Sequence, residues 1–263
     1  MRALMLIGLF LALALPGFAA DDFAEFDGKQ AFDYSQAAIG RTVGDYTFRD
    51  SKGAEMALSD YAGKPVVISM IYTSCYHTCP MITNNLIRTT EGARTILDAE
   101  DYTILTVGFD APVDTPDRMR QYARERGIEA PNWHLLSADA ATIARLSADL
   151  GFIFFPSPKG FDHLAQTTVL TPEGKVFQHV YTANFEAPFL VEPLKELVYG
   201  AGPRTFRLAD FTEQLTLFCT FYDPKSGRYR FDYSLLVAII VGSLSLMGIG
   251  VFLVREWFFK PRP

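Results

Sequence analysis

A run of apolar residues that leads directly into two closely spaced cysteines most constrains how this chain can fold. Residues 66–71 read Val-Val-Ile-Ser-Met-Ile, and the segment Cys75–Pro80 follows shortly after them. A nearly continuous apolar run of this length is typical of a central strand covered on both faces. Pro80 lacks a backbone N–H and has a preset φ, so it suits the first position of a helix, with Cys79 as the preceding cap. The sequence therefore predicts a strand, a dithiol loop and a helix in succession.

The position of the two thiols indicates chemistry beyond packing. A thiol at a helix N-terminus lies close to unpaired N–H groups and to the positive end of the helix dipole, and both favour the thiolate. Thiolate is the form that attacks disulfides and binds copper or zinc. The same spacing also arises by chance in an apolar chain, or as a plain structural disulfide. Cys75 and Cys79 are therefore candidates for metal or redox chemistry, with a structural pair as the alternative.

The other elements follow a regular alternation. A turn at residues 51–53 predicts a hairpin between residues 44–50 and 55–58, and residues 104–109 form a second buried run. Further helices are predicted over residues 115–126, 138–150 and 187–199, and further strands over residues 133–136, 167–171 and 176–181. The resulting order is β-α-β-α-β-α-β-β-α, with the dithiol after the first central strand. This layout predicts an α/β, thioredoxin-like fold, with a central mixed sheet flanked by helices.

Both ends of the chain are apolar. Residues 3–15 are followed by small residues, which predicts an export signal over residues 1–20. An uncleaved anchor is the alternative, but this run is short for a bilayer span of about 20 residues. Residues 234–254 carry no charge and are long enough to cross a bilayer as a helix, whereas a buried soluble helix of that length would be unusual. We therefore expect a body outside the cytoplasm, a C-terminal transmembrane helix and a cytoplasmic tail over residues 255–263.

The segments between these ends complete the division of the chain. Residues 21–37 are polar with scattered aromatics and are predicted to form an extended lead-in to a domain over residues 38–200. Residues 201–233 form a juxtamembrane extension. The net charge of −6 argues against nucleic acid as a partner, because binding phosphates requires a concentrated positive surface. Three cysteines are too few for a disulfide scaffold, which leaves Cys219 outside the dithiol.

Three separated segments of the domain match one pattern. They are a dithiol segment at Tyr72–Pro80, an acidic loop ending in Asp-Thr-Pro at Asp110–Pro116, and a histidine before a hairpin at Phe161–His163. In this order they resemble the Sco (synthesis of cytochrome c oxidase) family, called SenC or PrrC in bacteria. The resemblance covers about residues 38–200. It implies a thioredoxin-like domain that binds one copper ion through Cys75, Cys79 and His163.

The resemblance also implies a function. It indicates a copper chaperone, rather than an enzyme, that assists assembly of the copper centre of cytochrome c oxidase. The implied partner is the copper-accepting subunit of a respiratory oxidase or a related copper enzyme, and the implied location is the bacterial inner membrane, with the domain in the periplasm. Two thiolates and an imidazole suit Cu(I) and tolerate Cu(II). The alternative is a thiol–disulfide oxidoreductase in which Cys75 and Cys79 reduce the acceptor's cysteines. A peroxide-reducing relative is less favoured, since no basic residue is placed at Cys75.

Several polar residues have two interpretations. Asp110 and Asp114 either position the metal-binding histidine or a basic partner, or they cap a helix and form a turn. His77 either joins the metal or faces solvent, and we take the second as the default. His134 and His179 fall on strand-like runs, where a hydrogen-bonded structural imidazole is expected.

The sequence departs from the family pattern in three places. Tyr76 follows the first cysteine where Pro is common. The predicted span at residues 234–254 is C-terminal, whereas Sco proteins are usually held by an N-terminal span or a lipid. The extension over residues 201–233 is not needed by the core domain and contains Cys219. For Cys219, an extra copper ligand, an interchain disulfide partner and a buried thiol are the alternatives, and we take a buried thiol as the default.

Overall fold

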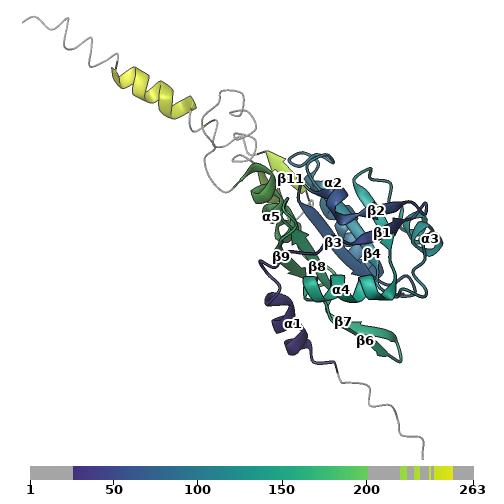
Figure 1. Cartoon of the computed structure of the whole chain (residues 1–263). Helices are drawn as coiled ribbons and strands as arrows, with labels where there is room; N and C mark the ends of the chain where they lie inside the picture. Colours follow the sequence, from purple (N-terminus) through teal and green to yellow (C-terminus); the bar gives the residue numbers. More distant parts are fainter. Residues whose placement is uncertain (1–25, 201–219, 224–227, 232–236, 238–239, 251–263) are drawn as a thin grey trace, which may run out of the picture.

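A seven-stranded mixed sheet forms the centre of the molecule (Figure 1). The computed structural model describes residues 26–200, 220–223, 228–231, 237 and 240–250. Across the sheet the strands are β2 (Glu55–Ala57), β1 (Thr47–Asp50), β5 (Trp133–Ser137), β4 (Thr103–Gly108), β3 (Val66–Ile71), β8 (Gln166–Leu170) and β9 (Val176–Tyr181). The three central strands β5, β4 and β3 are parallel, while β1, β2, β8 and β9 pair with their neighbours antiparallel. This is the mixed sheet that the sequence predicts.

Helices cover both faces of this sheet. Their bounds are α1 (Gly28–Gln36), α2 (Thr78–Ala93), α3 (Pro116–Arg126), α4 (Ala140–Leu150) and α5 (Pro188–Tyr199), with a short 3-10 helix η1 (Leu58–Tyr61) after β2. The helices α2 and α3 join consecutive parallel strands, and α2 contacts both α3 and α5. After β5 the chain turns back toward β8, and α4 crosses the side of the sheet that faces the viewer in Figure 1.

The core forms where the sequence is most continuously apolar. All six residues of β3 and all six of β4 are buried, as expected for strands covered on both faces. The apolar face of α4 contributes Ile143, Leu146 and Leu150, which are spaced by about one helical turn and are almost fully buried. Each such side chain stabilises the fold by about 1.5–3 kcal/mol relative to an exposed one. The sheet therefore gives the loops at its edge a rigid support.

The helices begin and end close to the residues that the sequence predicts. The Thr115 hydroxyl accepts a hydrogen bond from the Arg118 N–H and caps α3, and Gly127 ends that helix with a positive φ of 66°. Asp139 caps α4 by accepting from the Thr142 N–H at 2.7 Å. Capping side chains at these positions satisfy N–H groups that have no partner within the helix. The predicted hairpins 44–58 and 167–181 are also present, as β1–β2 and β8–β9.

The prediction of an extended lead-in over residues 21–37 is wrong in its described part. Residues 28–36 form α1, which begins after Asp27, whose carboxylate accepts hydrogen bonds from two backbone N–H groups of the first turn. The helix packs on β9, where the Ser35 hydroxyl lies 2.7 Å from the Tyr181 hydroxyl oxygen. A capping Asp before a helix with buried Ala31 and Ser35 explains the difference, because the helix is stabilised by this packing.

A further hairpin, between α4 and β8, does not appear among the predicted elements. It consists of β6 (Phe154–Ser157) and β7 (Gly160–His163), which pair antiparallel and form a two-stranded sheet of their own. In Figure 1 it extends from one end of the central sheet. Because His163 is the last residue of β7, this hairpin sets the position of the predicted histidine ligand.

The C-terminal predictions are only partly covered by the structure. Strands β10 (Thr220–Asp223) and β11 (Arg228–Phe231) form an antiparallel hairpin within the extension, and β11 lies beside α2. In the part of the chain that is described, no helix has both the length and the apolar character needed to cross a membrane. Residues 237 and 240–250 are helical, and the rest of the predicted span lies outside the described residues. The predicted signal, the tail and Cys219 also lie outside them.

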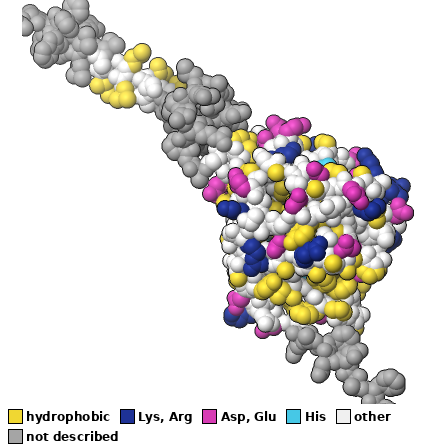
Figure 2. All heavy atoms as spheres, viewed as in Figure 1, with side chains coloured by type: hydrophobic (Ala, Val, Ile, Leu, Met, Phe, Trp, Pro, Cys, Tyr) yellow, Lys and Arg dark blue, Asp and Glu magenta, His cyan; other side chains and the backbone are white. Residues whose placement is uncertain are grey.

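On the face of the body shown in Figure 2, acidic and basic side chains are interspersed. Apolar side chains gather on the lower part of the face in this view.

Candidate metal centre

The dithiol loop joins the end of β3 to α2. The helix begins at Thr78 with His77 as its N-cap, so the prediction that Cys79 caps the helix is wrong by two residues. Pro80 is tolerated at the third helical position because N–H groups of the first turn have no partner within the helix. The Cys79 N–H instead donates to the Cys75 sulfur at 3.4 Å. The first thiol therefore satisfies a backbone donor beside the second.

The two thiols are inequivalent. The pKa of Cys75 is lowered, mainly because the Cys79 thiol donates a hydrogen bond to the Cys75 sulfur, and backbone N–H groups and the Tyr72 hydroxyl add to this effect. The pKa of Cys79 is raised by the same hydrogen bond and by burial. Cys79 is 0% exposed and Cys75 is 9% exposed. The pKa values of the two thiols are therefore shifted in opposite directions, which favours the thiolate at Cys75 over that at Cys79.

Asp114 fixes the dithiol loop to the acidic loop that follows β4. Its carboxylate accepts hydrogen bonds from the Thr73 N–H at 2.8 Å, the Thr73 hydroxyl at 2.6 Å and the Asp110 N–H at 2.9 Å. These loops meet because β3 and β4 are parallel, so both leave the same edge of the sheet. Burial raises the pKa of Asp114. The bond from the Asp110 N–H is the turn-forming contact that was one of the two predicted roles of Asp114, and the bonds from Thr73 connect the two loops.

His163 lies at the same end of the sheet. Its Nδ1 is 2.7 Å from the Leu164 carbonyl oxygen, so Nδ1 carries the proton and Nε2 keeps its lone pair. Burial lowers the pKa of His163, which favours the neutral imidazole that binds metals, while the nearby Cys75 charge acts in the opposite direction. The imidazole lies near the segment that leads into the dithiol, because its ring is 6.0 Å from that of Tyr72.

Aromatic rings separate and position these groups. The Tyr72 ring centroid lies 5.2 Å from that of Phe161 and 6.0 Å from that of His163. The His163 ring also lies 5.4 Å from the ring of Phe109. Tyr72 thus contacts the β6–β7 hairpin with its ring and the Cys75 sulfur with its hydroxyl. This one side chain connects the dithiol with the strand that carries the histidine.

The structure brings the two thiols together but does not close a three-ligand set around them. Among the described residues, no three His, Cys, Asp or Glu side chains gather as a group that would hold a metal ion. The donor set itself fits a soft metal, since a thiolate, a thiol that can lose its proton and a neutral imidazole lie at one edge of the sheet. Completing the set requires His163 to approach the dithiol.

The other histidines have the positions expected of them. His179 is buried, and its Nε2 donates to the Ser35 carbonyl oxygen at 2.9 Å while Nδ1 lies 3.0 Å from the Thr168 hydroxyl. His134 is half-buried with its ring 5.1 Å from that of Tyr61. His77 is exposed. Neither His134 nor His179 faces the dithiol.

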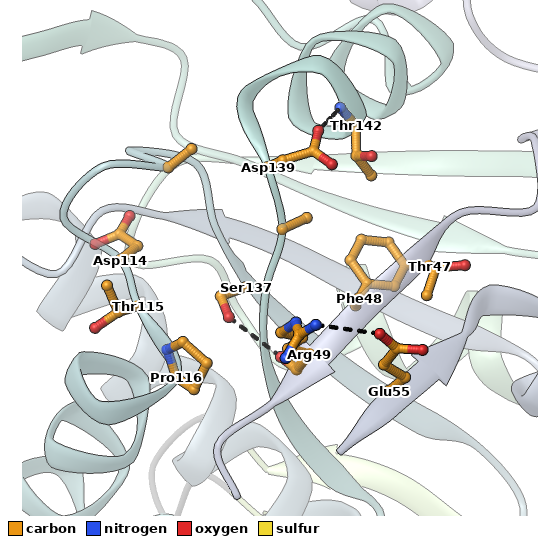
Figure 3. Close-up of a pocket in the computed structure, with 12 residues that line it drawn as sticks. Thr47, Phe48, Arg49, Glu55, Asp114, Thr115, Pro116, Ser137, Asp139 and Thr142 are labelled. Atoms are coloured by element: carbon orange, nitrogen blue, oxygen red, sulfur yellow. Dashed lines mark hydrogen bonds and ion pairs between the residues drawn. The ribbon is translucent and has the colours of Figure 1, made fainter. Parts of the chain in front are cut away.

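A cavity lies beside the acidic loop, and residues of that loop line it (Figure 3). Its volume is about 360 Å³, and Arg49, Glu55, Asp114 and Asp139 are among its lining residues. Arg49 and Glu55 form an ion pair at 3.2 Å, and Asp139 accepts the capping hydrogen bond of α4. Because these charged groups neutralise or cap one another, the cavity offers no evident centre for chemistry.

Tyr72 and Thr73 belong to the dithiol segment Tyr72–Pro80, but the sequence alone assigns neither residue a role. Both residues follow β3 directly. Residues that come directly after a buried parallel strand are expected at the edge of the sheet where the ends of the parallel strands meet. The β6–β7 hairpin also had a signal, because aromatic residues flank the turn-forming segment Pro158–Gly160.

Comparisons with known proteins agree with this arrangement. A solved structure of a candidate electron transfer protein from Aquifex aeolicus VF5 is 30% identical, covers 62% of this chain and 96% of its own, and gives a TM-score of 0.57. BsSco, a member of the Sco family of cytochrome c oxidase assembly proteins with a disulfide switch, is 19% identical, and the match covers 61% of this chain and 95% of BsSco, with a TM-score of 0.54. Arabidopsis thaliana ScoI with copper bound is 16% identical, and the match covers 60% of this chain and 97% of ScoI, with a TM-score of 0.50.

A search of curated proteins gave no match. The sequence model of the SCO1/SenC family matches residues 35–199, which is more than half of the chain and includes the dithiol, the acidic loop and His163. The chain therefore belongs to the SCO1/SenC family.

Proposed function

We propose that this protein is a membrane-tethered copper chaperone that binds one copper ion through Cys75, Cys79 and His163 and assists assembly of the copper centre of cytochrome c oxidase. The observation that carries this proposal is the contact between the Cys79 N–H and the Cys75 sulfur, together with an imidazole at the same edge of the sheet that bonds to the backbone through Nδ1 and so can offer Nε2 to a metal. Membership of the SCO1/SenC family supports it. Copper is the cargo, and it is also the metal in the Arabidopsis thaliana structure.

Each residue has a distinct part in this function. Cys75 offers a thiolate that binds copper without first losing a proton, whereas Cys79 releases its proton on binding. His163 supplies Nε2, because the Leu164 carbonyl oxygen accepts the proton on Nδ1. Its hairpin is not part of the seven-stranded sheet, so His163 can approach the dithiol without breaking the central hydrogen-bond ladder.

The test uses the full chain and three single variants. Cys75→Ser and Cys79→Ser should each abolish tight copper binding, and His163→Ala should weaken Cu(II) binding by at least about tenfold while thiol alkylation stays unchanged. His134→Ala is the matched control, because it removes an imidazole that does not face the dithiol. Unchanged copper affinity and spectrum in His163→Ala would overturn the three-ligand site.

A thiol–disulfide oxidoreductase is the second candidate, and the inequivalent thiols favour it. A low-pKa Cys75 is the attacking thiolate, and a buried Cys79 is the resolving thiol that releases the reduced target. Two electrons pass from the dithiol to the target's disulfide, and the Cys75–Cys79 disulfide forms. The test is whether the reduced chain reduces the oxidised copper-binding cysteines of an oxidase-subunit fragment. This activity should survive in His163→Ala, which separates the two functions.

The proposed setting is the outer face of the bacterial inner membrane. It rests on the predicted export signal over residues 1–20 and the predicted span over residues 234–254. A strain lacking the protein should lose copper-dependent oxidase activity, and added copper should restore part of it. Rescue by the wild-type chain but not by the Cys75, Cys79 or His163 variants would link the site to assembly.

A further inference from the structure

The two thiols of the dithiol loop are hidden, although the proposed function requires metal to pass through them. Cys79 is 0% exposed and Cys75 is 9% exposed. Two other soft donors of the same segment face solvent, since His77 is exposed and Met81 is 42% exposed. A metal ion arriving from outside therefore meets an imidazole and a thioether before it meets a thiol.

His77 and Met81 lie four positions apart at the start of α2, with His77 just outside the helix in a non-helical backbone conformation (φ −129°, ψ −77°). His77 is the N-cap of α2, and the Met81 N–H donates to the His77 carbonyl oxygen at 3.3 Å, which closes the first turn. Residues four positions apart lie one above the other on a helix. Cys79 stands two positions from each of them, which is roughly half a turn around the helix axis. The same turn therefore directs its thiol into the core and its His–Met pair toward solvent.

The His77 ring is free to bind a metal. It makes no capping hydrogen bond, and no partner for the imidazole is present in the part of the chain that is described. Met81 is 42% exposed in a helix whose Ile82 and Leu86 are buried, so a large part of its side chain is accessible from solvent. Imidazole and thioether together are donors that suit Cu(I), whereas hard cations prefer oxygen ligands.

We propose that His77 and Met81 form an outer copper site that receives Cu(I) and passes it to Cys75 and Cys79. This step rests on the proposed copper binding by the dithiol. Copper remains Cu(I) throughout: its bonds to the His77 nitrogen and the Met81 sulfur break as bonds to two thiolates form, and the Cys79 proton goes to solvent. Transfer is inward because anionic thiolates bind Cu(I) more strongly than neutral donors do.

The first test isolates the outer site. The full chain with Cys75→Ser and Cys79→Ser, labelled with ¹³C at the methionine methyl groups, is titrated with Cu(I) under anaerobic conditions, and circular dichroism verifies its fold. One of the seven methionine methyl signals should shift, and this signal should be absent in Met81→Leu. Adding His77→Ala should weaken the apparent affinity on the order of tenfold. If no methyl signal shifts, or if the shift does not depend on His77, the proposal is overturned.

The second test follows transfer in the chain that keeps both thiols. Delivery of Cu(I) from its bicinchoninate complex should slow on the order of tenfold in the His77→Ala/Met81→Leu variant, with the final dithiol affinity changed by less than about twofold. Tyr76→Ala is the matched control, because Tyr76 is 81% exposed in the same loop and has no soft donor. Equal slowing in Tyr76→Ala would overturn the proposal. A dithiol that binds no copper would contradict the proposed function, while the methyl titration would still decide the outer site.

Discussion

The Cys79 amide nitrogen lies 3.4 Å from the Cys75 sulfur, so the first cysteine accepts a hydrogen bond from the first turn of α2. This contact links the chemical state of the dithiol to the helix. A thiolate is a stronger acceptor than a thiol, and it also receives the Cys79 S–H. Metal binding or oxidation removes that S–H donor, whereas the backbone N–H remains. The surroundings of the reduced, metal-free pair therefore favour the thiolate at Cys75.

The S–H donor can be removed selectively. Cys79→Ala should raise the pKa of Cys75 on the order of one unit, because the hydrogen bond from the Cys79 thiol, the largest cause of the depression, is lost while the backbone N–H remains. Cys79→Ser keeps an O–H donor and should give a smaller rise. The measurement is the rate of iodoacetamide alkylation of Cys75 against pH, in a Cys219→Ser background. Identical midpoints in Cys79→Ala and wild type would show that the S–H donor has no effect.

Asp114→Asn tests the connection between the two loops. The carboxylate is 1% exposed and accepts three hydrogen bonds, two from Thr73 and one from Asp110. An asparagine keeps one acceptor oxygen and turns an NH₂ group toward donors, so the free energy of unfolding should fall by about 2–3 kcal/mol. Urea denaturation monitored by circular dichroism measures it.

Asp110→Asn is the control for that variant. Asp110 contributes its backbone N–H to the network, and its side chain is only half-buried. Its substitution should change the free energy of unfolding by less than about 0.5 kcal/mol. Equal losses in the two variants would mean that general loop charge, not the Asp114 hydrogen bonds, stabilises the fold.

The sequence predicts those elements whose signals are local. The apolar runs of β3 and β4 and the start of the helix at residue 115 depend on residues that are neighbours in the sequence, and these elements appear where expected. Residues 28–36 look polar because α1 buries only a narrow face against β9. Its helical state depends on that tertiary contact, which periodicity in a short segment does not reveal.

The features of the candidate site also differ in how far the sequence predicts them. The dithiol is visible because two cysteines lie four positions apart, whereas His163 stands far along the chain and was identified by resemblance. The inequivalence of the thiols depends on a buried S–H···S contact and on the Tyr72 hydroxyl. Neither is set by spacing alone. Sequence reasoning therefore found the donors but not their protonation states.

Gly160→Ala should disturb the aromatic connection to His163. Gly160 has a φ of +116°, and a Cβ there would lie 2.8 Å from the Tyr72 hydroxyl oxygen. Tyr72 must then move away from Cys75 or the hairpin must shift, so both stability and Cu(II) affinity should fall. Gly174→Ala is matched in having a positive φ of +76° with open space around its Cβ. It should cost about 1–2 kcal/mol of stability and leave copper affinity unchanged. Equal copper affinities in the two variants would contradict the role of Tyr72.

His179 predicts a specific loss of stability in acid. Burial lowers its pKa from 6.5 to about 4, and its contacts are neutral: the Thr168 hydroxyl, the Gln166 amide and the Ser35 carbonyl. Between these values the unfolded chain binds a proton that the folded chain does not, so stability falls as pH decreases. The contribution of neutral His179 to stability is complete above its pKa in the unfolded chain. It is lost as the pH falls through its pKa in the folded chain. Since His179 is 5% exposed, the expected loss between pH 7 and pH 4 is about 2–3 kcal/mol.

His179→Gln isolates this contribution, because glutamine retains a donor for the Ser35 carbonyl but does not titrate. Urea denaturation of both proteins at pH 7, 6, 5 and 4 gives the difference in free energy of unfolding at each pH. His163 and His134 titrate in both proteins, so their contributions cancel in this difference. The advantage of the wild type over His179→Gln should shrink steadily below about pH 6.5, the unfolded pKa of histidine. A difference that stays constant with pH would mean that His179 is protonated equally in the folded and unfolded chains, and that the contact between α1 and β9 does not depend on its neutral form.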